Sequence, residues 1–350
     1  MKSMKAYVLR GVGDLRFEEI PVPDLTPGWA LVRVKAAGIC SSDIPRIFTK
    51  GTYHFPTIPG HEFSGVVEAV FPGDHDSENQ SWVGKRVSAF PLIPCRKCAQ
   101  CEAGRYELCE NYDYLGSRRD GGFAEYVAAP VWNLMELPEN VSFEVGAMME
   151  PLSVARHACR IGRIQPGDSV AVVGTGMIGF AAARWANAFG AEKVMILGRN
   201  EAKRSLAERL GCVKYANLSD KNQISDCKAE VVIEAVGTPD AIQTALELAA
   251  PGGRVVLMGN PSGDIALKQD DYWRILRKQL TLSGTWNSSY QGEKRSDWTE
   301  ARDALADGNM IAEPLITHRF GFEQLPRGLE LMKKHKTPYC KIMIDFPSSL

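Results

Sequence analysis

The fold is decided by the stretch Ser169-Val170-Ala171-Val172-Val173-Gly174-Thr175-Gly176-Met177-Ile178-Gly179. An uninterrupted apolar strand leads directly into glycines spaced G-x-G-x-x-G, and a helix is predicted over 178–189. In this context the first glycine permits a tight turn, the second lets a pyrophosphate approach the backbone, and the third lets helix and strand pack closely. The helix N-terminus offers free N–H groups to the phosphates. A plain glycine-rich turn is the alternative. The predicted cofactor-binding residues are Gly174, Gly176, Met177, Ile178 and Gly179.

Apolar strands continue to alternate with helical patterns beyond this stretch. Strands are predicted over 194–197, 231–234 and 254–258, and helices over 201–210 and 239–250. Strands that are apolar throughout are typical of a parallel sheet covered on both faces. The sequence therefore predicts an α/β fold with a doubly wound parallel sheet, the Rossmann architecture, over residues 151–290.

The first 150 residues have a different texture, rich in glycine, proline and β-branched residues. Alternating or apolar runs predict strands over 30–36, 63–70 and 123–127, separated by Gly/Pro turns. Short strands joined by such turns indicate a mostly β domain. The domain boundary is predicted near Glu150.

Composition excludes several classes of protein. The chain has 350 residues, 45% hydrophobic and 24% charged, which is ordinary for a globular protein of two domains. Its 41 basic and 42 acidic residues nearly cancel, so no overall basic field attracts nucleic acid or an anionic membrane. No apolar run approaches the ~20 residues of a membrane span. The N-terminal residues 1–5 lack the apolar region of a signal peptide, so we expect a cytoplasmic protein.

Nine cysteines are the unusual count, and four of them crowd together. The spacing Cys95-x2-Cys98-x2-Cys101-x7-Cys109 supplies four thiolates for a closed, tetrahedral structural Zn²⁺. An iron–sulfur cluster is the rival, because similar triple-cysteine runs bind [4Fe–4S]. The surrounding chain has no second electron-transfer motif, which favours zinc. The remaining cysteines outside the candidate sites are interpreted as bystanders: Cys159, Cys212, Cys227 and Cys340.

A second candidate metal site is dispersed along the first domain. Cys40, the pair His61-Glu62, and Glu150 at the domain junction offer a thiolate, an imidazole and two carboxylates. A catalytic zinc takes about three protein ligands and leaves one position for water or substrate. Spacing alone does not establish this site, because a Cys and a His 21 positions apart are more often unrelated core residues.

The end of the second parallel strand distinguishes between dinucleotides. NAD enzymes usually place Asp or Glu there to hold the ribose hydroxyls. This chain has Leu197-Gly198-Arg199-Asn200 instead. Arg199, with Lys203 or Arg204, is predicted to bind the 2′-phosphate of NADP. The alternative is a solvated helix start and NAD as the cofactor.

Taken in order, these motifs resemble the zinc-dependent medium-chain dehydrogenase/reductase family over nearly the whole chain. The resemblance is carried by Gly38-x-Cys40-x-Ser42-Asp43, Gly60-His61-Glu62, the four cysteines, Ala124-Glu125-Tyr126, Glu150-Pro151 and the glycine turn. Within the family the chain looks most like polyol and sugar-alcohol dehydrogenases. That likeness rests on Ser42–Phe48, Tyr114–Gly122, Gly284–Asn287, Glu313–Ile316 and Thr317–Arg319.

The resemblance implies roles for the dispersed residues. Cys40 and His61 would bind the catalytic zinc, completed by Glu150 or Glu62. Ser42 matches the hydroxyl that relays the proton of the alcohol.

The resemblance also implies that Asp43 orients His61 from beside the metal. It implies a GroES-like catalytic domain over 1–150, a Rossmann domain over 151–290 and a segment, 291–350, that returns to the catalytic domain. A homodimer or homotetramer is expected on the same ground. Gly198-Arg199 departs from the NAD-dependent relatives, which carry Asp.

The function implied is hydride transfer between a secondary alcohol of a polyol phosphate, similar to galactitol 1-phosphate, and NAD(P). The guanidinium or ammonium groups of Arg46, Lys50, Arg118 and Arg119 are the candidates to bind the phosphate, although ordinary surface cations are an equal alternative for each. Tyr53 and Trp286 are candidates to line the substrate pocket, with core positions as the alternative.

Two other functions remain as alternatives. The first is a dehydrogenase for an unphosphorylated polyol, butanediol or threonine. The second is a zinc-bearing protein that binds NADPH without turnover. An intact set of Cys40, Ser42, His61 and Glu150 argues against the second.

Overall fold

The computed structural model describes residues 2–71, 80–210, 214–224, 227–261, 263–334 and 336–347, so Cys212 lies outside the described residues. The chain forms two compact units. The first contains Met1–Glu150, Ser289–Ala306 and Ile316–Leu350, and the second contains Pro151–Ser288 and Asp307–Leu315. The predicted domains, 1–150, 151–290 and 291–350, do not include the return of Asp307–Leu315 to the second unit. Those domain boundaries stay a prediction. Among the described residues, no helix has both the length and the apolar character needed to cross a membrane.

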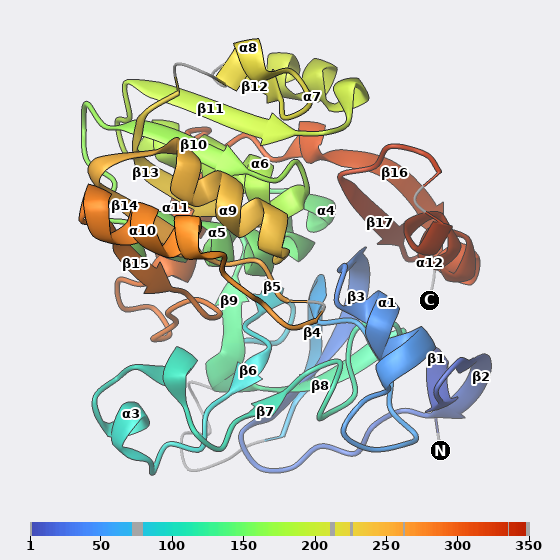
Figure 1. Ribbon diagram of the computed structural model, residues 1–350. Coiled ribbons are helices and arrows are strands. Elements are labelled where there is room, and N and C mark those ends of the chain that lie inside the picture. Colours follow the sequence, from blue (N-terminus) through green and yellow to red (C-terminus); the bar gives the residue numbers. More distant parts are fainter. Residues whose placement is uncertain are drawn as a thin grey trace. The chain divides into compact units, whose positions relative to one another are not determined.

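The second unit is built on a six-stranded parallel sheet, with the order β12-β11-β10-β13-β14-β15 (Figure 1). Its strands are β10 (Ser169–Val173), β11 (Lys193–Gly198), β12 (Lys214–Asn217), β13 (Ala229–Glu234), β14 (Ala249–Leu257) and β15 (Thr281–Gly284). The order runs outward from the middle in both directions, and right-handed crossovers therefore send α6 (Met177–Ala188) and α9 (Pro239–Leu248) to opposite faces. The predicted doubly wound parallel sheet is confirmed.

Local chemistry sets the helices of this unit. Thr238 caps α9 by accepting a hydrogen bond from the Ala241 N–H, and Pro239 occupies the first turn, where its missing N–H costs nothing. α9 and α10 pack against each other in front of the sheet (Figure 1). The predicted helix 201–210 is interrupted near its start. The other helices are η4 (Glu201–Lys203), α7 (Arg204–Arg209), α8 (Lys221–Ile224), α10 (Gln269–Lys278) and η5 (Glu313–Leu315).

The first unit contains a seven-stranded sheet with the order β16-β17-β3-β4-β5-β9, and β8 also pairs with β3. A hairpin, β1-β2, and a small β6-β7 ribbon accompany it. The eleven residues of β3 are long enough to pair β8 along one part of the same edge and β17 along another. The bounds are β1 (Ser3–Gly11), β2 (Asp14–Pro21), β3 (Trp29–Ile39), β4 (Glu62–Val70), β5 (Arg86–Ala89), β6 (Leu92–Ile93), β7 (Asp113–Tyr114), β8 (Tyr126–Pro130), β9 (Leu134–Glu136), β16 (Ile316–Gly321) and β17 (Lys341–Asp345).

The predicted strand 123–127 is shifted in the structure, where β8 covers Tyr126–Pro130. Phe123 instead donates its backbone N–H to the Pro59 carbonyl, and Glu125 donates to the Lys5 carbonyl. The segment before β8 is therefore bound to β1 and to the turn before β4, and its contact with β3 continues through the Val34 N–H, which donates to the Glu125 carbonyl at 2.9 Å.

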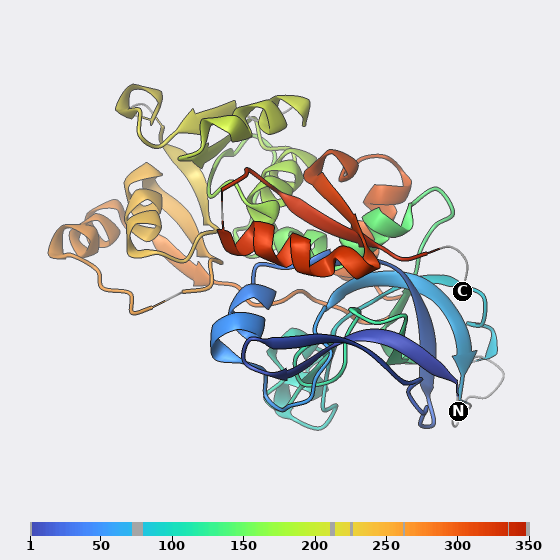
Figure 2. The same ribbon diagram turned by 90° about the vertical axis from the view of Figure 1, so that its right-hand side faces the viewer.

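Chain-terminal elements complete the first unit. Figures 1 and 2 show β16, β17 and α12 in red, with α12 packed on β16. β17 pairs antiparallel with β3, so the last strand lies inside the sheet. The helices are α1 (Asp43–Pro45), η1 (Arg46–Lys50), α3 (Ala99–Glu102), η2 (Tyr106–Leu108), η3 (Val131–Asn133), α4 (Phe143–Ala147), α11 (Asp297–Ala306), η6 (Phe322–Gln324) and α12 (Leu325–Lys334); α5 (Met149–Ile161) spans the boundary between the two units.

Candidate active site

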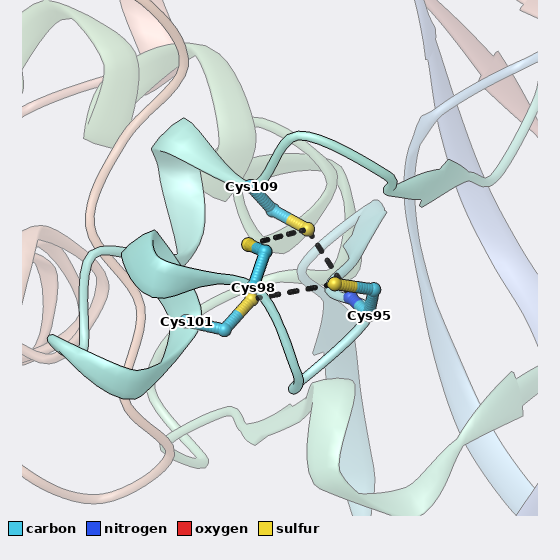
Figure 3. A group of neighbouring side chains, drawn as sticks. All are labelled: Cys95, Cys98, Cys101 and Cys109. Carbon is cyan, nitrogen blue, oxygen red and sulfur yellow. Dashed lines mark hydrogen bonds between the residues drawn. The ribbon is translucent and has the colours of Figure 1, made fainter.

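The four crowded cysteines converge in the first unit (Figure 3). All four sulfur atoms lie within 4.8 Å of one another. The Cys95 and Cys101 sulfurs are 4.0 Å apart, as are those of Cys98 and Cys109. Four sulfurs at ~2.3 Å from one tetrahedral zinc would be separated by ~3.8 Å, whereas a disulfide needs ~2.05 Å. The donor set therefore fits a single Zn²⁺, and it leaves no position open for substrate. A four-iron cluster would separate the sulfurs more, because each would bind a different iron.

Local backbone groups favour the thiolate that such a metal needs. The N–H groups of Glu110 and Cys101 lower the pKa of Cys98 to about 6. The Cys95 N–H donates to the Cys109 sulfur at 3.2 Å. Burial acts in the opposite direction on Cys101, raising its pKa to about 12. The surroundings therefore favour the thiolate of Cys98 but not that of Cys101, and a bound cation would favour the thiolate form of all four cysteines.

Two neighbouring strands bring the dispersed residues together. Cys40 follows directly on β3, and Glu62 begins β4, with Gly38 and Glu62 opposite each other in the ladder. His61 precedes Glu62, so thiolate, imidazole and carboxylate meet at one end of the β3–β4 pair. Their ligand atoms lie within 4.8 Å of one another. A soft sulfur, a nitrogen and an oxygen at this separation suit a zinc ion that keeps one position open.

Asp43 contacts both Cys40 and His61. Its Oδ2 accepts the Cys40 N–H at 2.9 Å, and its Oδ1 lies 3.6 Å from His61 Nδ1. Burial disfavours the imidazolium of His61, but the Cys40 thiolate and the Asp43 carboxylate outweigh it and raise the pKa of His61 well above its ordinary value. Asp43 thus occupies the place predicted for a residue that orients His61 from beside the metal.

Ser42 and Arg46 form the adjoining polar wall. The Ser42 hydroxyl donates to Cys40 Sγ at 3.3 Å. Arg46 Nη1 donates to Ser42 Oγ at 3.1 Å and to Asp43 Oδ1 at 3.3 Å. Arg46 was predicted as a phosphate-binding cation; in the structure its guanidinium already contacts the residues around the candidate metal site.

Glu62 is held by a buried lysine. Lys341 Nζ, on β17, forms an ion pair with Glu62 Oε2 and donates to the Ile39 carbonyl at 3.2 Å. Both side chains of the pair are 2–3% exposed. Gly38 is needed beside them, because a Cβ there would overlap the Glu62 carboxylate. The pair cancels one negative charge next to the candidate ligands.

Glu150 stands outside the group formed by Cys40, His61 and Glu62. It accepts a 3.4 Å hydrogen bond from the Tyr114 hydroxyl, and the Tyr114 ring lies 5.8 Å from the His61 ring, centroid to centroid. Burial, reinforced by the charge of Glu62, raises the pKa of Glu150 to about 7. The carboxylate is therefore next to the site without belonging to the compact donor set.

The glycine turn has the shape that a dinucleotide requires. Gly174 has φ +122°, which favours glycine. A Cβ on Gly179 would overlap the Gly174 carbonyl oxygen, so the third glycine permits the close packing of helix and strand. A Cβ on Gly176 would meet no atom of the described residues within 4 Å. Since packing does not require glycine at Gly176, its open face suits the approach of a pyrophosphate to the N-terminus of α6, where Met177 and Ile178 stand.

The predicted 2′-phosphate residues lie after β11. Arg199 is 70% exposed and pairs with Asp240 at 3.4 Å. Arg204 pairs with Glu201 and stacks on Tyr215. Lys203 is largely buried. Of the three cations, Arg199 is the most accessible to a ligand.

The remaining substrate candidates have different surroundings. The Arg118 guanidinium lies between the rings of Tyr53 and Tyr112, at 4.2 and 4.3 Å from their centroids. Arg119 instead pairs with Asp113 at 2.7 Å. Trp286 is half exposed and belongs to the second unit.

Sequence reasoning assigned no role to Lys341 or Tyr114. Lys341 opens an apolar strand, where a lysine usually marks a solvent-facing end, and only its buried pairing reveals its place. Tyr114 lay within a stretch that carries the family resemblance, so the signal was present without a chemical interpretation.

Comparison with known proteins gives the same two-part organisation. Residues 26–139 match the family model described as "Alcohol dehydrogenase GroES-like domain", and residues 178–307 match "Zinc-binding dehydrogenase". The chain is 33% identical to galactitol 1-phosphate 5-dehydrogenase of Escherichia coli K12, over 97% of this chain and 100% of that protein. It is also 33% identical to L-threonine 3-dehydrogenase of Bacillus licheniformis, over 95% of this chain and 96% of that protein.

Solved structures are similar over the full length. An E. coli CFT073 alcohol dehydrogenase complexed with NADH has a TM-score of 0.88 and 28% identity, covering 98% of this chain and 99% of that one. A zinc-binding dehydrogenase from Sinorhizobium meliloti 1021 bound to NADP has a TM-score of 0.87 and 28% identity, covering 99% and 100%.

Proposed function

Since this chain belongs to the zinc-dependent medium-chain dehydrogenase/reductase family, we propose that it oxidises a secondary hydroxyl of a polyol phosphate similar to galactitol 1-phosphate, with NADP⁺ preferred as hydride acceptor. Zinc and NAD(P) dependence and alcohol or polyol oxidation follow from the family. The phosphate and the choice of NADP⁺ are the finer proposals. The observation that carries the reaction is the meeting of Cys40, His61 and Glu62 within 4.8 Å, beside the Ser42 hydroxyl.

The side chains divide the work of the reaction. Cys40 and His61 would hold the metal, with Glu62 within reach, and Asp43 keeps both in place. A zinc ion held there would supply Lewis-acid polarisation of the alcohol, and a bound NAD(P)⁺ would supply the hydride acceptor.

The proton of the alcohol is assigned to Ser42 Oγ. This oxygen receives a hydrogen bond from Arg46 Nη1 and directs its own proton to Cys40 Sγ. Ser42 Oγ takes this proton as its own hydroxyl proton is released toward solvent, and the hydrogen bond from the guanidinium stabilises the negative charge on Oγ between release and uptake.

The phosphate proposal is supported by likeness and by one cation. The relative named for galactitol 1-phosphate matches along the whole chain. The Arg118 guanidinium lies 4.2 and 4.3 Å from the ring centroids of Tyr53 and Tyr112, its Nη1 donates to the Tyr112 carbonyl at 2.8 Å, and its Nε has no hydrogen-bond partner among the described residues. A guanidinium fixed in this way is suited to a phosphate oxygen.

The substrate is tested by comparing kcat/KM for galactitol 1-phosphate, galactitol and sorbitol with purified, zinc-loaded enzyme. We expect the phosphate ester to be favoured at least tenfold and Arg118→Gln to remove most of that preference, mainly through KM. Arg119→Gln is the matched control, because Arg119 pairs with Asp113, and it should leave the preference unchanged. Equal values for galactitol and its phosphate would overturn the phosphate proposal.

The cofactor is tested by measuring Kd for NADP⁺ and NAD⁺. Arg199→Ala should weaken NADP⁺ about tenfold or more and leave NAD⁺ nearly unchanged, because only NADP⁺ carries the 2′-phosphate. A clear preference for NAD⁺ that Arg199→Ala does not alter would contradict the NADP⁺ proposal.

A second candidate function is a dehydrogenase for an unphosphorylated substrate. It is favoured by the equal identity to L-threonine 3-dehydrogenase of B. licheniformis. Threonine, 2,3-butanediol and sorbitol therefore belong in the same panel, and the substrate with the highest kcat/KM decides.

A further inference from the structure

The end of β11 is packed against the glycine turn. β10 and β11 are adjacent parallel strands with Val173 opposite Leu197, so the residues that follow them lie side by side. The N–H of Gly174 donates to the Leu197 carbonyl at 2.8 Å, which draws the turn onto the strand end. As a result, Thr175 covers Gly198.

A side chain at position 198 would collide with Thr175. A Cβ built on Gly198 would lie 3.1 Å from the Thr175 Cβ and 2.7 Å from its Oγ1, and closer still to its Cγ2. The first distance is tight, and the other two are not tolerated by real Cβ atoms.

Rotation of Thr175 does not remove the collision. The substituents of the Thr175 Cβ can stand in three staggered positions. The two positions that Oγ1 and Cγ2 now occupy are both too close to a Cβ at residue 198. Threonine has two heavy atoms to place in those three sites, so at least one of them occupies a crowded site in every rotamer.

Position 198 is where NAD-dependent enzymes of this architecture place the carboxylate that binds the ribose hydroxyls. We propose that Thr175 and Gly198 form a steric pair that sets dinucleotide specificity: Thr175 occupies the space of that carboxylate and thereby leaves recognition of the ribose to Arg199. The direction of the preference rests on the proposed use of NADP⁺, but the coupling between positions 175 and 198 does not.

If Thr175 and Gly198 form a steric pair, the effect of Gly198→Asp on Tm and on NAD⁺ binding should depend on the residue at position 175. Gly198→Asp alone should lower Tm by several degrees through overpacking and should tighten NAD⁺ binding by less than twofold. Thr175→Ala removes the two closest of the three nearest atoms and keeps the third, the Cβ at 3.1 Å. In the double variant Thr175→Ala/Gly198→Asp, Tm should recover, and NAD⁺ should bind about tenfold or more tightly than in Gly198→Asp.

The matched control is Thr175→Val/Gly198→Asp. Valine keeps the branched shape of threonine and loses only the hydroxyl, so this double variant should behave like Gly198→Asp. The measurements are Kd for NAD⁺ and NADP⁺ by calorimetry or fluorescence titration, and Tm without cofactor. Gly198→Ala, with and without Thr175→Ala, repeats the Tm test with a smaller side chain if the aspartate variants do not fold.

Three results would overturn the steric pair. The first is tight NAD⁺ binding by Gly198→Asp alone without loss of Tm. The second is the same Kd for NAD⁺ and the same Tm in Thr175→Ala/Gly198→Asp and Thr175→Val/Gly198→Asp. The third is a Tm of Gly198→Ala that Thr175→Ala does not restore. Failure of the NADP⁺ proposal is separate, because it would appear as a preference for NAD⁺ in the unsubstituted enzyme.

Discussion

Replacing Lys341 by methionine tests how much its buried ion pair with Glu62 contributes to stability. Methionine keeps much of the length and the apolar stem of lysine but loses the ammonium group. Glu62 Oε2 then loses its ion-pair partner, and the Ile39 carbonyl loses a donor. Because Lys341 and Glu62 are both almost completely buried, water cannot replace either contact.

The magnitude follows from that burial. Breaking a buried ion pair by removing one partner typically costs ~3–5 kcal/mol, because the remaining charge is left uncompensated. At ~1.4 kcal/mol per factor of ten, this corresponds to a hundredfold or greater fall in the ratio of folded to unfolded protein. Loading with Zn²⁺ should recover part of the loss, since the cation offers Glu62 a new partner and binds only the folded state.

The assay is urea unfolding of the metal-free and zinc-loaded protein, followed by hydrogen exchange of the β3 and β17 amides. The control is Lys85→Met, which breaks the more exposed ion pair between Lys85 and Glu136 in the same unit and should cost less than ~1 kcal/mol. Adding Glu62→Gln to Lys341→Met removes the uncompensated charge and should restore most of the stability.

Either of two results would refute the reasoning. The first is a cost for Lys341→Met no greater than that for Lys85→Met. The second is a double variant, with Glu62→Gln, that is no more stable than Lys341→Met alone.

Four other substitutions test the sites. Cys101→Ser should reduce zinc from two ions per chain to one and lower Tm, and an unchanged zinc content would contradict the four-sulfur site. Gly176→Ala should weaken NADP⁺ binding about tenfold with Tm unchanged, since its Cβ meets no described atom and reaches only into the ligand's space. Gly179→Ala should instead lower Tm by overpacking against the Gly174 carbonyl; equal Tm values for the two glycine variants would count against this distinction. Asp43→Asn should weaken zinc binding 10–100-fold in competition with a chelator, and undiminished affinity would mean that Asp43 does not orient the ligands.

Strong periodic signals made the second unit predictable. The apolar strand before Gly174 and the helix after it are local features, and the parallel sheet followed from their repetition. α10 was not predicted, because its surface is largely polar and its apolar residues Tyr272, Trp273 and Leu276 stay partly exposed. The helix packs on α9, and its sequence also carries local signals that were missed: Asp270 and Asp271 in the first turn, and Arg277 and Lys278 in the last.

The candidate site was predictable only where its spacing is short. The four cysteines lie within fifteen residues, so their spacing alone indicated a metal. Cys40 and His61 came together through the register of β3 and β4, which a sequence pattern does not specify. The Lys341–Glu62 pair spans 279 residues, and no local rule connects its members.

The position of β17 inside the sheet of the first unit has a consequence during synthesis. Lys341 reaches the Ile39 carbonyl across 302 residues of chain. At the ~5–20 residues per second of a ribosome, β3 waits roughly 15–60 s for β17, although its other two partners, β4 and β8, are made earlier. The parallel unit, made almost entirely in between, can fold during that interval. Until β17 arrives, this part of the β3 edge is open to pairing with other nascent chains, and Glu62 has no counter-ion. Translation rate should therefore affect the yield of active enzyme more than the stability of the finished protein suggests.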